Sequence, residues 1–357
     1  MKVLNVIGTR PQYIKLFPVC RELAGNGYEN VIVDTGQHYD ETLSQVFLEE
    51  LDIPSVDYDL DVRSGSHGEQ TGRMLAEIED IVEEEDPDAV IVYGDTNSTL
   101  AAAIATAKLP PRLTHVESGT RSYNRSMPEE LNRVMTDHVS DVLYAPTERA
   151  VENLAHEGLT DGVVLTGDVM YDAILWAREY VATSEDRGVL DDLPIEPGEF
   201  VLATVHRPRN TDDGQRLQAI LSVLDEHPLP VVFPAHPRVR NRIAELDLDA
   251  ELGADFHLID PVGYLDFVRL LDGAERVATD SGGAQKEAFM LETPCVTLRE
   301  ETEWDETVEC GWNRLVGADP DLIREALGEN GNRPPRPDPF GDGRAAERIV
   351  GALDDGS

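Results

Sequence analysis

Acidic side chains follow two neighbouring strand patterns in the first half of the chain. Asp95 comes directly after the apolar run VIVYG at residues 90–94, and Glu117 follows LTHV at residues 113–116. Both carboxylates should project into one cleft, because the carboxyl ends of parallel strands meet at the same edge of a sheet. Carboxylates in different surroundings can divide general acid and general base roles. Asp95 also has a structural alternative, as the N-cap of the helix that follows it.

A third candidate opens a helix pattern that begins at Pro128. Glu129 and Glu130 occupy its first turn, where acidic side chains are common because they interact favourably with the helix dipole. We take Glu129 as an acid or base candidate, with the helix start as its structural alternative.

Two cations follow the first strand pattern. The segment GTRPQYIK at residues 8–15 places Arg10 and Lys15 near a helix N-terminus, which indicates an anion site, most simply for phosphate. It lacks the GxGxxG spacing and therefore does not indicate a dinucleotide fold. Lys15 stands out because the chain has only four lysines, Lys2, Lys15, Lys108 and Lys286.

The second half repeats this arrangement. His206 ends a strand pattern, and the segment DSGGAQKE at residues 280–287 follows another and opens a helix. Backbone N–H groups of Ser281, Gly282 and Gly283 could hold a diphosphate. Glu287 could accept hydrogen bonds from ribose hydroxyls. Phe267 could contact a uracil, or pack in the core.

Alternating strand and helix patterns must position these residues. Strands are predicted at residues 2–7, 30–35, 89–93, 113–116, 142–144, 163–166, 200–205, 230–233, 256–259, 276–279 and 295–298. Helices are predicted at residues 12–24, near 41–51, and at 96–107, 128–139 and 343–353. A further helix is predicted after the loop at residues 64–68 and ends near residue 85. Apolar strands that alternate with helices favour parallel sheets flanked by helices. A polar stretch at residues 184–198 separates an expected N-terminal domain, residues 1–170, from a second domain, residues 185–340.

The composition excludes several classes of function. Thirty basic and seventy acidic side chains give a net charge of −40 with no basic stripe, which argues against binding nucleic acid or anionic lipid. Such a surface is tolerable when molar salt screens it, so we expect a halophilic cytoplasm. No apolar run is long enough for a membrane span, and the N-terminus reads as a strand. Three dispersed cysteines and nine scattered histidines predict no disulfide and no metal site.

Together these motifs resemble the non-hydrolysing UDP-N-acetylglucosamine 2-epimerase family. The matching stretches occur in order along nearly the whole chain: GTRP at residues 8–11 with Lys15, GQH at 36–38, GDT at 94–96, HVESGTR at 115–121, PEELNR at 128–133, HR at 206–207 and DSGG at 280–283. The composition suggests a haloarchaeal type of member.

The resemblance implies two Rossmann-like domains in the GT-B arrangement, with the active site in the cleft between them and usually a homodimer. A C-terminal helix, here residues 343–354, would cross back to the first domain. It implies interconversion of UDP-GlcNAc and UDP-ManNAc by elimination and re-addition of UDP, without a cofactor or metal. Asp95, Glu117, Glu129 and His206 become the catalytic candidates. The substrate-binding candidates are Arg10, Lys15, Phe267, Ser281, Gly282, Gly283 and Glu287.

Two positions depart from a common family pattern. Trp304 stands where many members have a substrate-contacting Arg, and Val262 stands where some have Gln. With the run QKE at residues 285–287, both resemble a sister branch that epimerises UDP-2,3-diacetamido-2,3-dideoxyglucuronate. Other classes that stay open are a GT-B glycosyltransferase and a UDP-sugar sensor without catalysis.

Overall fold

The computed structural model describes residues 1–37, 50–51, 53–63, 65–184, 188–329 and 334–354. Its chain divides into two compact units. Unit 1 comprises Met1–Leu175 and Asp338–Ser357, and unit 2 comprises Trp176–Pro337. The helix expected near residues 41–51 and His38 of the GQH motif fall largely outside the described residues.

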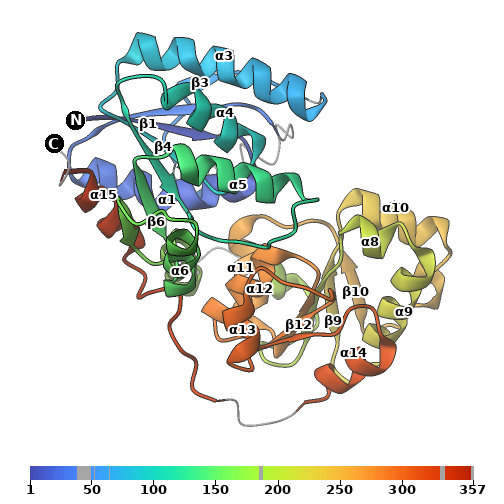
Figure 1. The fold of residues 1–357 in the computed structure, drawn as a ribbon. Helices are drawn as coiled ribbons and strands as arrows, with labels where there is room; N and C mark the ends of the chain where they lie inside the picture. The colour runs from blue at the N-terminus through green and yellow to red at the C-terminus, as the bar shows by residue number, and fades with distance from the viewer. Residues whose placement is uncertain (38–49, 52, 64, 185–187, 330–333, 355–357) are drawn as a thin grey trace. The chain divides into compact units, whose positions relative to one another are not determined.

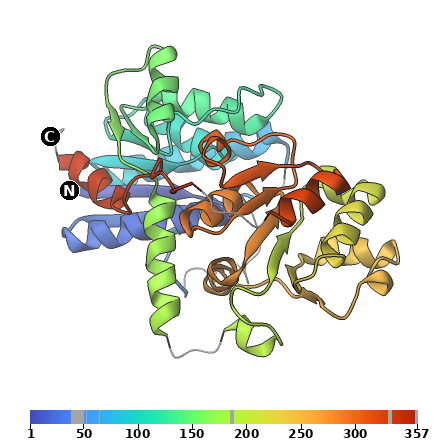
Figure 2. The ribbon, with the colours of Figure 1, turned by 90° about the horizontal axis from the view of Figure 1, so that it is seen from below.

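Unit 1 is built on a parallel sheet with strand order β3-β2-β1-β4-β5-β6-β7 (Figure 1). Its strands are β1 (Lys2–Ile7), β2 (Glu29–Asp34), β3 (Tyr58–Asp59), β4 (Ala89–Tyr93), β5 (Arg112–Val116), β6 (Val142–Ala145) and β7 (Val163–Leu165). Its helices are α1 (Arg10–Gly25), α3 (His67–Glu85), α4 (Asn97–Thr106), α5 (Pro128–Val139), α6 (Glu148–His156), the first part of α7 (Val169–Thr183), and α15 (Ala345–Asp354). Helices α3 and α4 cover one face of the sheet, and α15 packs beside α1 (Figures 1 and 2).

Unit 2 repeats the plan with strand order β10-β9-β8-β11-β12-β13. Its strands are β8 (Val201–Thr204), β9 (Val231–Pro234), β10 (Phe256–Ile259), β11 (Arg276–Thr279), β12 (Cys295–Thr297) and β13 (Asn313–Leu315). Its helices are α8 (Pro208–Thr211), α9 (Gly214–Asp225), α10 (Pro237–Glu245), α11 (Tyr264–Gly273), α12 (Gly282–Met290), α13 (Asp305–Glu309) and α14 (Pro320–Leu327), with short 3-10 turns at Val189–Asp192 and Asp249–Glu251.

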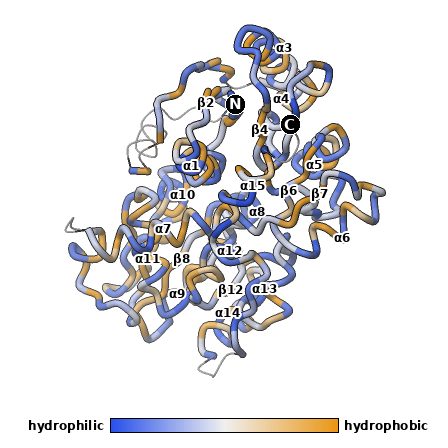
Figure 3. The backbone as a smooth tube through the Cα atoms, turned by 90° about the vertical axis from the view of Figure 1, so that its left-hand side faces the viewer, coloured by the Kyte–Doolittle hydropathy of each residue, from blue (hydrophilic) through white to orange (hydrophobic). Residues whose placement is uncertain are grey.

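The core pattern explains why these segments form strands and helices. Strand β4 is buried throughout, as a strand covered on both faces should be. Helix α3 buries Met74, Ile78, Ile81 and Val82, and Figure 3 shows the resulting alternation of hydrophilic and hydrophobic stretches along it. The predicted fold class, parallel sheets flanked by helices, is confirmed.

The short edge strands β3 and β13 were not predicted. They pair over only two and three residues, with β2 and β12 respectively. Segments this short show no period in the sequence and become strands only through pairing with a neighbour. In each unit the order reverses beside a central strand, between β1 and β4 and between β8 and β11. Open α/β sheets bind ligands at such switch points.

Candidate active site

A buried ion pair lies at the switch point of unit 1. Lys15 Nζ, from α1, lies 2.8 Å from Glu117 Oε1, and both side chains are 10% exposed. Glu117 is the first residue after β5, and its φ of 71° is in the left-handed region that non-glycine residues rarely adopt. Such a conformation costs of order 1–3 kcal/mol and persists only where surrounding contacts impose it. Arg10 is the first residue of α1.

Gly94, in the turn after β4, approaches this pair closely. It has a φ of 64°, and a Cβ at this position would lie 3.0 Å from Lys15 Nζ and 3.8 Å from Glu117 Oε1. A side chain here would both strain the backbone and push against the ion pair. Glycine therefore lets the β4 turn come next to the carboxylate.

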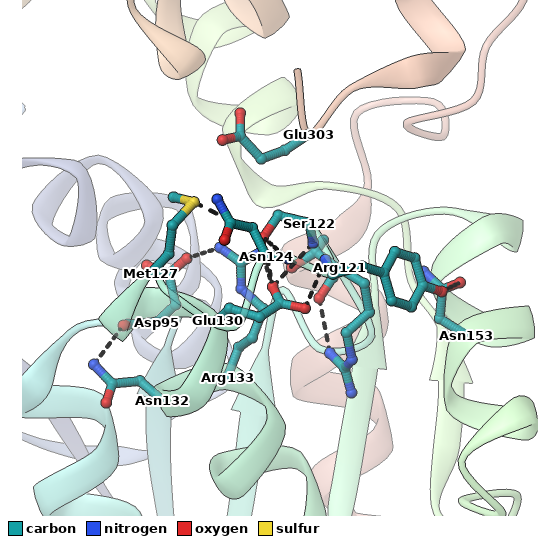
Figure 4. Close-up of polar contacts among 12 residues, drawn as sticks. Asp95, Arg121, Ser122, Asn124, Met127, Glu130, Asn132, Arg133, Asn153 and Glu303 are labelled. Carbon is teal, nitrogen blue, oxygen red and sulfur yellow. Dashed lines mark hydrogen bonds and ion pairs between the residues drawn. The ribbon is translucent and has the colours of Figure 1, made fainter. Parts of the chain in front are cut away.

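Asp95 forms an ion pair with Arg133 of α5 (Figure 4). Its backbone carbonyl accepts a 3.0 Å hydrogen bond from Asn132 Nδ2. The alternative role of Asp95 as a helix cap is wrong, because the N-cap of α4 is Thr96, whose side chain accepts from the Thr99 amide. The Asp95 carboxylate is thus left for polar contacts at the strand end.

The guanidinium of Arg133 lies near three carboxylates of unit 1. Burial opposes its charged form, but the carboxylates of Asp95, Glu130 and Glu117 outweigh that effect and raise its pKa. Sequence reasoning missed Arg133 as a functional residue. The available signal was the i, i+3 spacing of Glu130 and Arg133 on one helix face.

The two glutamates that open α5 lie in different environments. Glu129 is exposed. Glu130 is buried and accepts 2.9 Å hydrogen bonds from the Ser122 amide, the Ser122 hydroxyl and the Tyr123 amide (Figure 4). Glu130 also pairs with Arg133 at 3.2 Å. Glu130 therefore holds the loop before α5 in place, whereas the carboxylate of Glu129 is accessible from solvent.

Gln12 joins the two turns at this edge of the sheet and was also missed from the sequence. Its Oε1 accepts a 2.9 Å hydrogen bond from the Gly8 amide, and its Nε2 donates to the Tyr93 carbonyl at 2.8 Å. The side chain is 1% exposed. It ties the turn before α1 to the end of β4, which fixes Lys15 relative to Gly94.

In unit 2, His206 follows β8 and is held by Asp280. The Asp280 carboxylate is fully buried, and its Oδ1 lies 3.3 Å from His206 Nδ1. It also accepts hydrogen bonds of 3.0 Å from the amides of His206 and Arg207 and from Asn210 Nδ2. Burial lowers the pKa of His206, and the negative charge of Asp280 partly opposes this.

The predicted glycine-rich helix start is present in unit 2. Ser281 is the N-cap of α12, and Gly282 and Gly283 begin the helix. A Cβ at Gly282 would lie 3.5 Å from Glu303 Oε2, 3.8 Å from Arg299 Nη1 and 3.9 Å from Arg207 Nη2. A helix N-terminus flanked by two guanidinium groups can bind an anion. Arg299 is meanwhile paired with Glu303 at 2.9 Å.

Trp304 is fixed against the same helix. Its Nε1 donates a 3.0 Å hydrogen bond to the Gly282 carbonyl, and Lys286 Nζ lies 4.1 Å from the centre of its ring. Glu287 is buried in α12, 5% exposed. Trp304 therefore packs across the start of the helix that carries Ser281, Gly282 and Gly283.

Other candidates lie in different surroundings. Phe267 is partly exposed on α11, whose buried side is formed by Tyr264, Val268, Leu270 and Leu271. His236 caps α10, with Nδ1 accepting from the Arg238 amide at 3.2 Å. Among the described residues, no group of three or more His, Cys, Asp or Glu side chains could hold a metal ion, and no helix is long and apolar enough to cross a membrane.

The two parallel sheets, with polar groups after β1, β4, β5, β8 and β11, define a two-unit α/β protein of GT-B-like fold. A family model described as UDP-N-acetylglucosamine 2-epimerase matches residues 21–354. The chain belongs to this family.

Relatives cover almost the whole chain. A UDP-N-acetylglucosamine 2-epimerase homolog of Methanococcus maripaludis is 46% identical over 99% of both chains. The UDP-2,3-diacetamido-2,3-dideoxy-D-glucuronate 2-epimerase of Pseudomonas aeruginosa is 46% identical over 98% of both. A crystal structure of Methanocaldococcus jannaschii UDP-GlcNAc 2-epimerase in complex with UDP-GlcNAc and UDP is 41% identical, covers 100% of both chains and has a TM-score of 0.89.

Proposed function

We propose that this protein interconverts UDP-N-acetylglucosamine and UDP-N-acetylmannosamine by inverting C2 of the sugar. The observation that carries the proposal is the buried Lys15–Glu117 pair beside Gly94, within a chain of this family. A carboxylate held in place at a strand end can act as a general base.

In the proposed reaction, a carboxylate of unit 1 removes the C2 proton while the C1–O bond to UDP breaks. The electron pair of the C2–H bond becomes the C1=C2 double bond of 2-acetamidoglucal, and the C1–O pair leaves with UDP. UDP then adds back to C1 while C2 takes a proton on its opposite face. Asp95, Glu117 and Glu129 are the proposed acid and base groups. Glu117 is the first choice for the base because it pairs with Lys15 and its side chain is only 10% exposed.

Unit 2 would bind the departing UDP. The start of α12, at Ser281, Gly282 and Gly283, would stabilise the developing charge on the diphosphate. Arg10 and Lys15 of unit 1 are further proposed substrate-binding residues. Glu287 would accept hydrogen bonds from the ribose, and Phe267 would contact the uracil. His206, oriented by Asp280, would bridge the phosphate and the sugar.

We further propose that the protein is a homodimer that works in a cytoplasm of high salt, as haloarchaeal proteins do. The net charge of −40 supports the high-salt cytoplasm, because such a surface repels itself unless salt screens it. We propose that the product serves as a mannosamine-type precursor for a surface polysaccharide.

Incubation with UDP-GlcNAc in deuterated buffer with molar KCl tests the function. We expect UDP-ManNAc to form and both sugars to carry deuterium at C2, as read by NMR and mass spectrometry. Release of UDP without an epimer would contradict the proposal and indicate a hydrolysing enzyme or a glycosyltransferase. An unchanged sugar that binds would indicate a sensor or a different substrate.

The second candidate substrate is UDP-2,3-diacetamido-2,3-dideoxyglucuronate. Two observations favour it: the 46% identity to the Pseudomonas aeruginosa enzyme, and Trp304 packed on Lys286 at the start of α12. Product analysis with each sugar nucleotide under the same conditions separates the two. Faster turnover of the uronate would assign the chain to that substrate.

A further inference from the structure

His115 is buried in the middle of unit 1 and contacts two acceptors. It belongs to β5 and is 0% exposed. Its Nδ1 lies 2.6 Å from Asp137 Oδ1 of α5, and its Nε2 lies 2.8 Å from the Gly94 carbonyl oxygen. The mechanism proposed above does not use this side chain.

The hydrogen-bond partners determine where the ring protons are. A carbonyl oxygen can only accept, so Nε2 must carry a proton. Asp137 Oδ2 also forms an ion pair with Arg121 Nη2 at 2.7 Å and accepts a 3.1 Å hydrogen bond from the Gly119 amide. The Arg121 guanidinium and the Gly119 amide by themselves favour the ionised carboxylate, because both bind Asp137 Oδ2. An ionised carboxylate has no proton to donate, so Nδ1 must carry one as well.

We propose that His115 is a buried imidazolium that positions the two turns beside the Lys15–Glu117 pair. Nε2 holds the Gly94 carbonyl, in the turn that leads to Asp95. Nδ1 holds Asp137, which in turn holds the Gly119 amide, two residues after Glu117. One side chain thus ties the ends of β4 and β5 together. The effect on catalysis rests on the proposed function, whereas the protonation state does not.

The environment of Asp137 favours a charged ring at His115. Arg121 pairs with Asp137 at 2.7 Å and also with Glu157 at 2.8 Å. Glu157 is partly exposed and lies 3.5 Å from His138 Nε2, whereas Asp137 is fully buried. An imidazolium gives Asp137 a second positive partner in a place withdrawn from water.

NMR tests the protonation state without reference to activity. The protein is labelled with ¹⁵N-histidine at neutral pH in molar KCl, and the spectrum of His115→Gln identifies the signal. If that variant does not fold, the other histidines are replaced one at a time, and the signal that persists in every one of these variants belongs to His115. We expect two protonated ring nitrogens. One unprotonated, pyridine-type nitrogen would overturn the proposal.

Kinetics test the positioning role. His115→Phe should slow deuterium exchange at C2 by about 100-fold, because a small misplacement of catalytic groups has that effect. Its affinity for UDP, measured by calorimetry, should change by less than about threefold, because UDP is bound by other groups. His115→Gln keeps one hydrogen-bond donor for the Gly94 carbonyl. Its C2 deuterium exchange should therefore be about tenfold faster than that of His115→Phe.

Ile78→Ala is the matched control, because Ile78 is also 0% exposed in unit 1 but lies on α3. It should lower the melting temperature and leave the exchange rate of the folded protein unchanged. Exchange by His115→Phe at the wild-type rate would refute the positioning role. If the wild type itself does not exchange C2, the proposed function fails, and the NMR result still decides the state of His115.

Discussion

Lys15 and Glu117 are 102 residues apart in the sequence, yet their side chains meet at 2.8 Å and are both largely withdrawn from water. An ammonium group and a carboxylate in such a place depend on each other, since either alone would be a buried charge without a partner. This relationship gives the Glu117 side chain a fixed position.

Glu117→Gln should remove the general base while keeping an oxygen for Lys15. We expect C2 deuterium exchange to fall by about 10²–10⁴-fold, the usual contribution of a general acid or base, and UDP affinity to stay within a few-fold. Exchange is followed by NMR and binding by calorimetry. Glu83→Gln, at an exposed position of α3, is the control. Retained exchange in Glu117→Gln would remove this residue from the catalytic set.

The neighbours Glu129 and Glu130 should respond differently to the same substitution. Glu130→Gln disturbs a buried carboxylate that accepts three hydrogen bonds and pairs with Arg133, so it should lower the free energy of unfolding by about 1–3 kcal/mol. Glu129→Gln should leave the free energy of unfolding within about 0.5 kcal/mol and reduce activity. Chemical denaturation and exchange assays measure both. Full activity of Glu129→Gln would exclude it as an acid or base.

The titration of His206 should depend on Asp280. Because partial desolvation lowers the pKa of His206, its neutral form should persist to lower pH than in a free histidine, although half of the side chain is exposed. Asp280 opposes this shift, so Asp280→Asn should lower the His206 pKa further. An NMR titration of the His206 ring protons gives both values, with His206→Gln to assign the signal. A higher pKa in Asp280→Asn would show that the carboxylate does not act on this ring.

Asp172 should make stability depend on pH. Burial raises its pKa to about 6, although it accepts hydrogen bonds from the Ala345 and Ala346 amides at the start of α15. The unfolded value is about 3.9. Between these values the folded state binds a proton that the unfolded state lacks, so the free energy of unfolding should decrease as pH rises from about 4 to 6.

Asp172→Asn should flatten this part of the curve, as measured by denaturant titrations at several pH values. Glu69→Gln serves as the control, because Glu69 is an exposed acid on α3 whose pKa is lowered by a hydrogen bond from the Ser66 amide. This variant should keep the decrease in the free energy of unfolding between about pH 4 and 6. The same pH slope in Asp172→Asn as in the wild type would locate the effect elsewhere.

Salt should stabilise the protein strongly. With seventy acidic and thirty basic side chains, self-repulsion should fall as the Debye length shrinks from about 10 Å at 0.1 M to about 3 Å at 1 M. We expect the melting temperature to rise with KCl up to molar concentration, as followed by circular dichroism. A melting temperature that does not depend on salt would contradict the halophilic proposal.

The sequence alone determined the arrangement of strands and helices and the places where chemistry could occur. Runs such as VIVYG before Asp95 and LTHV before Glu117 predict buried parallel strands, and polar residues directly after them must lie at the ligand-binding edge of the sheet. This reasoning depends only on local periodicity, so it succeeded for β4 and failed for the two-residue strand β3.

Tertiary structure alone decided which polar groups meet. The sequence does not distinguish Glu129 from Glu130, does not pair Arg133 with Asp95, and does not place His115 between Asp137 and the Gly94 carbonyl. These relationships depend on burial and on contacts between residues far apart in the chain. Local sequence sets the direction of a backbone segment, whereas the partner and the charge state of a buried side chain are set by the segments that pack around it.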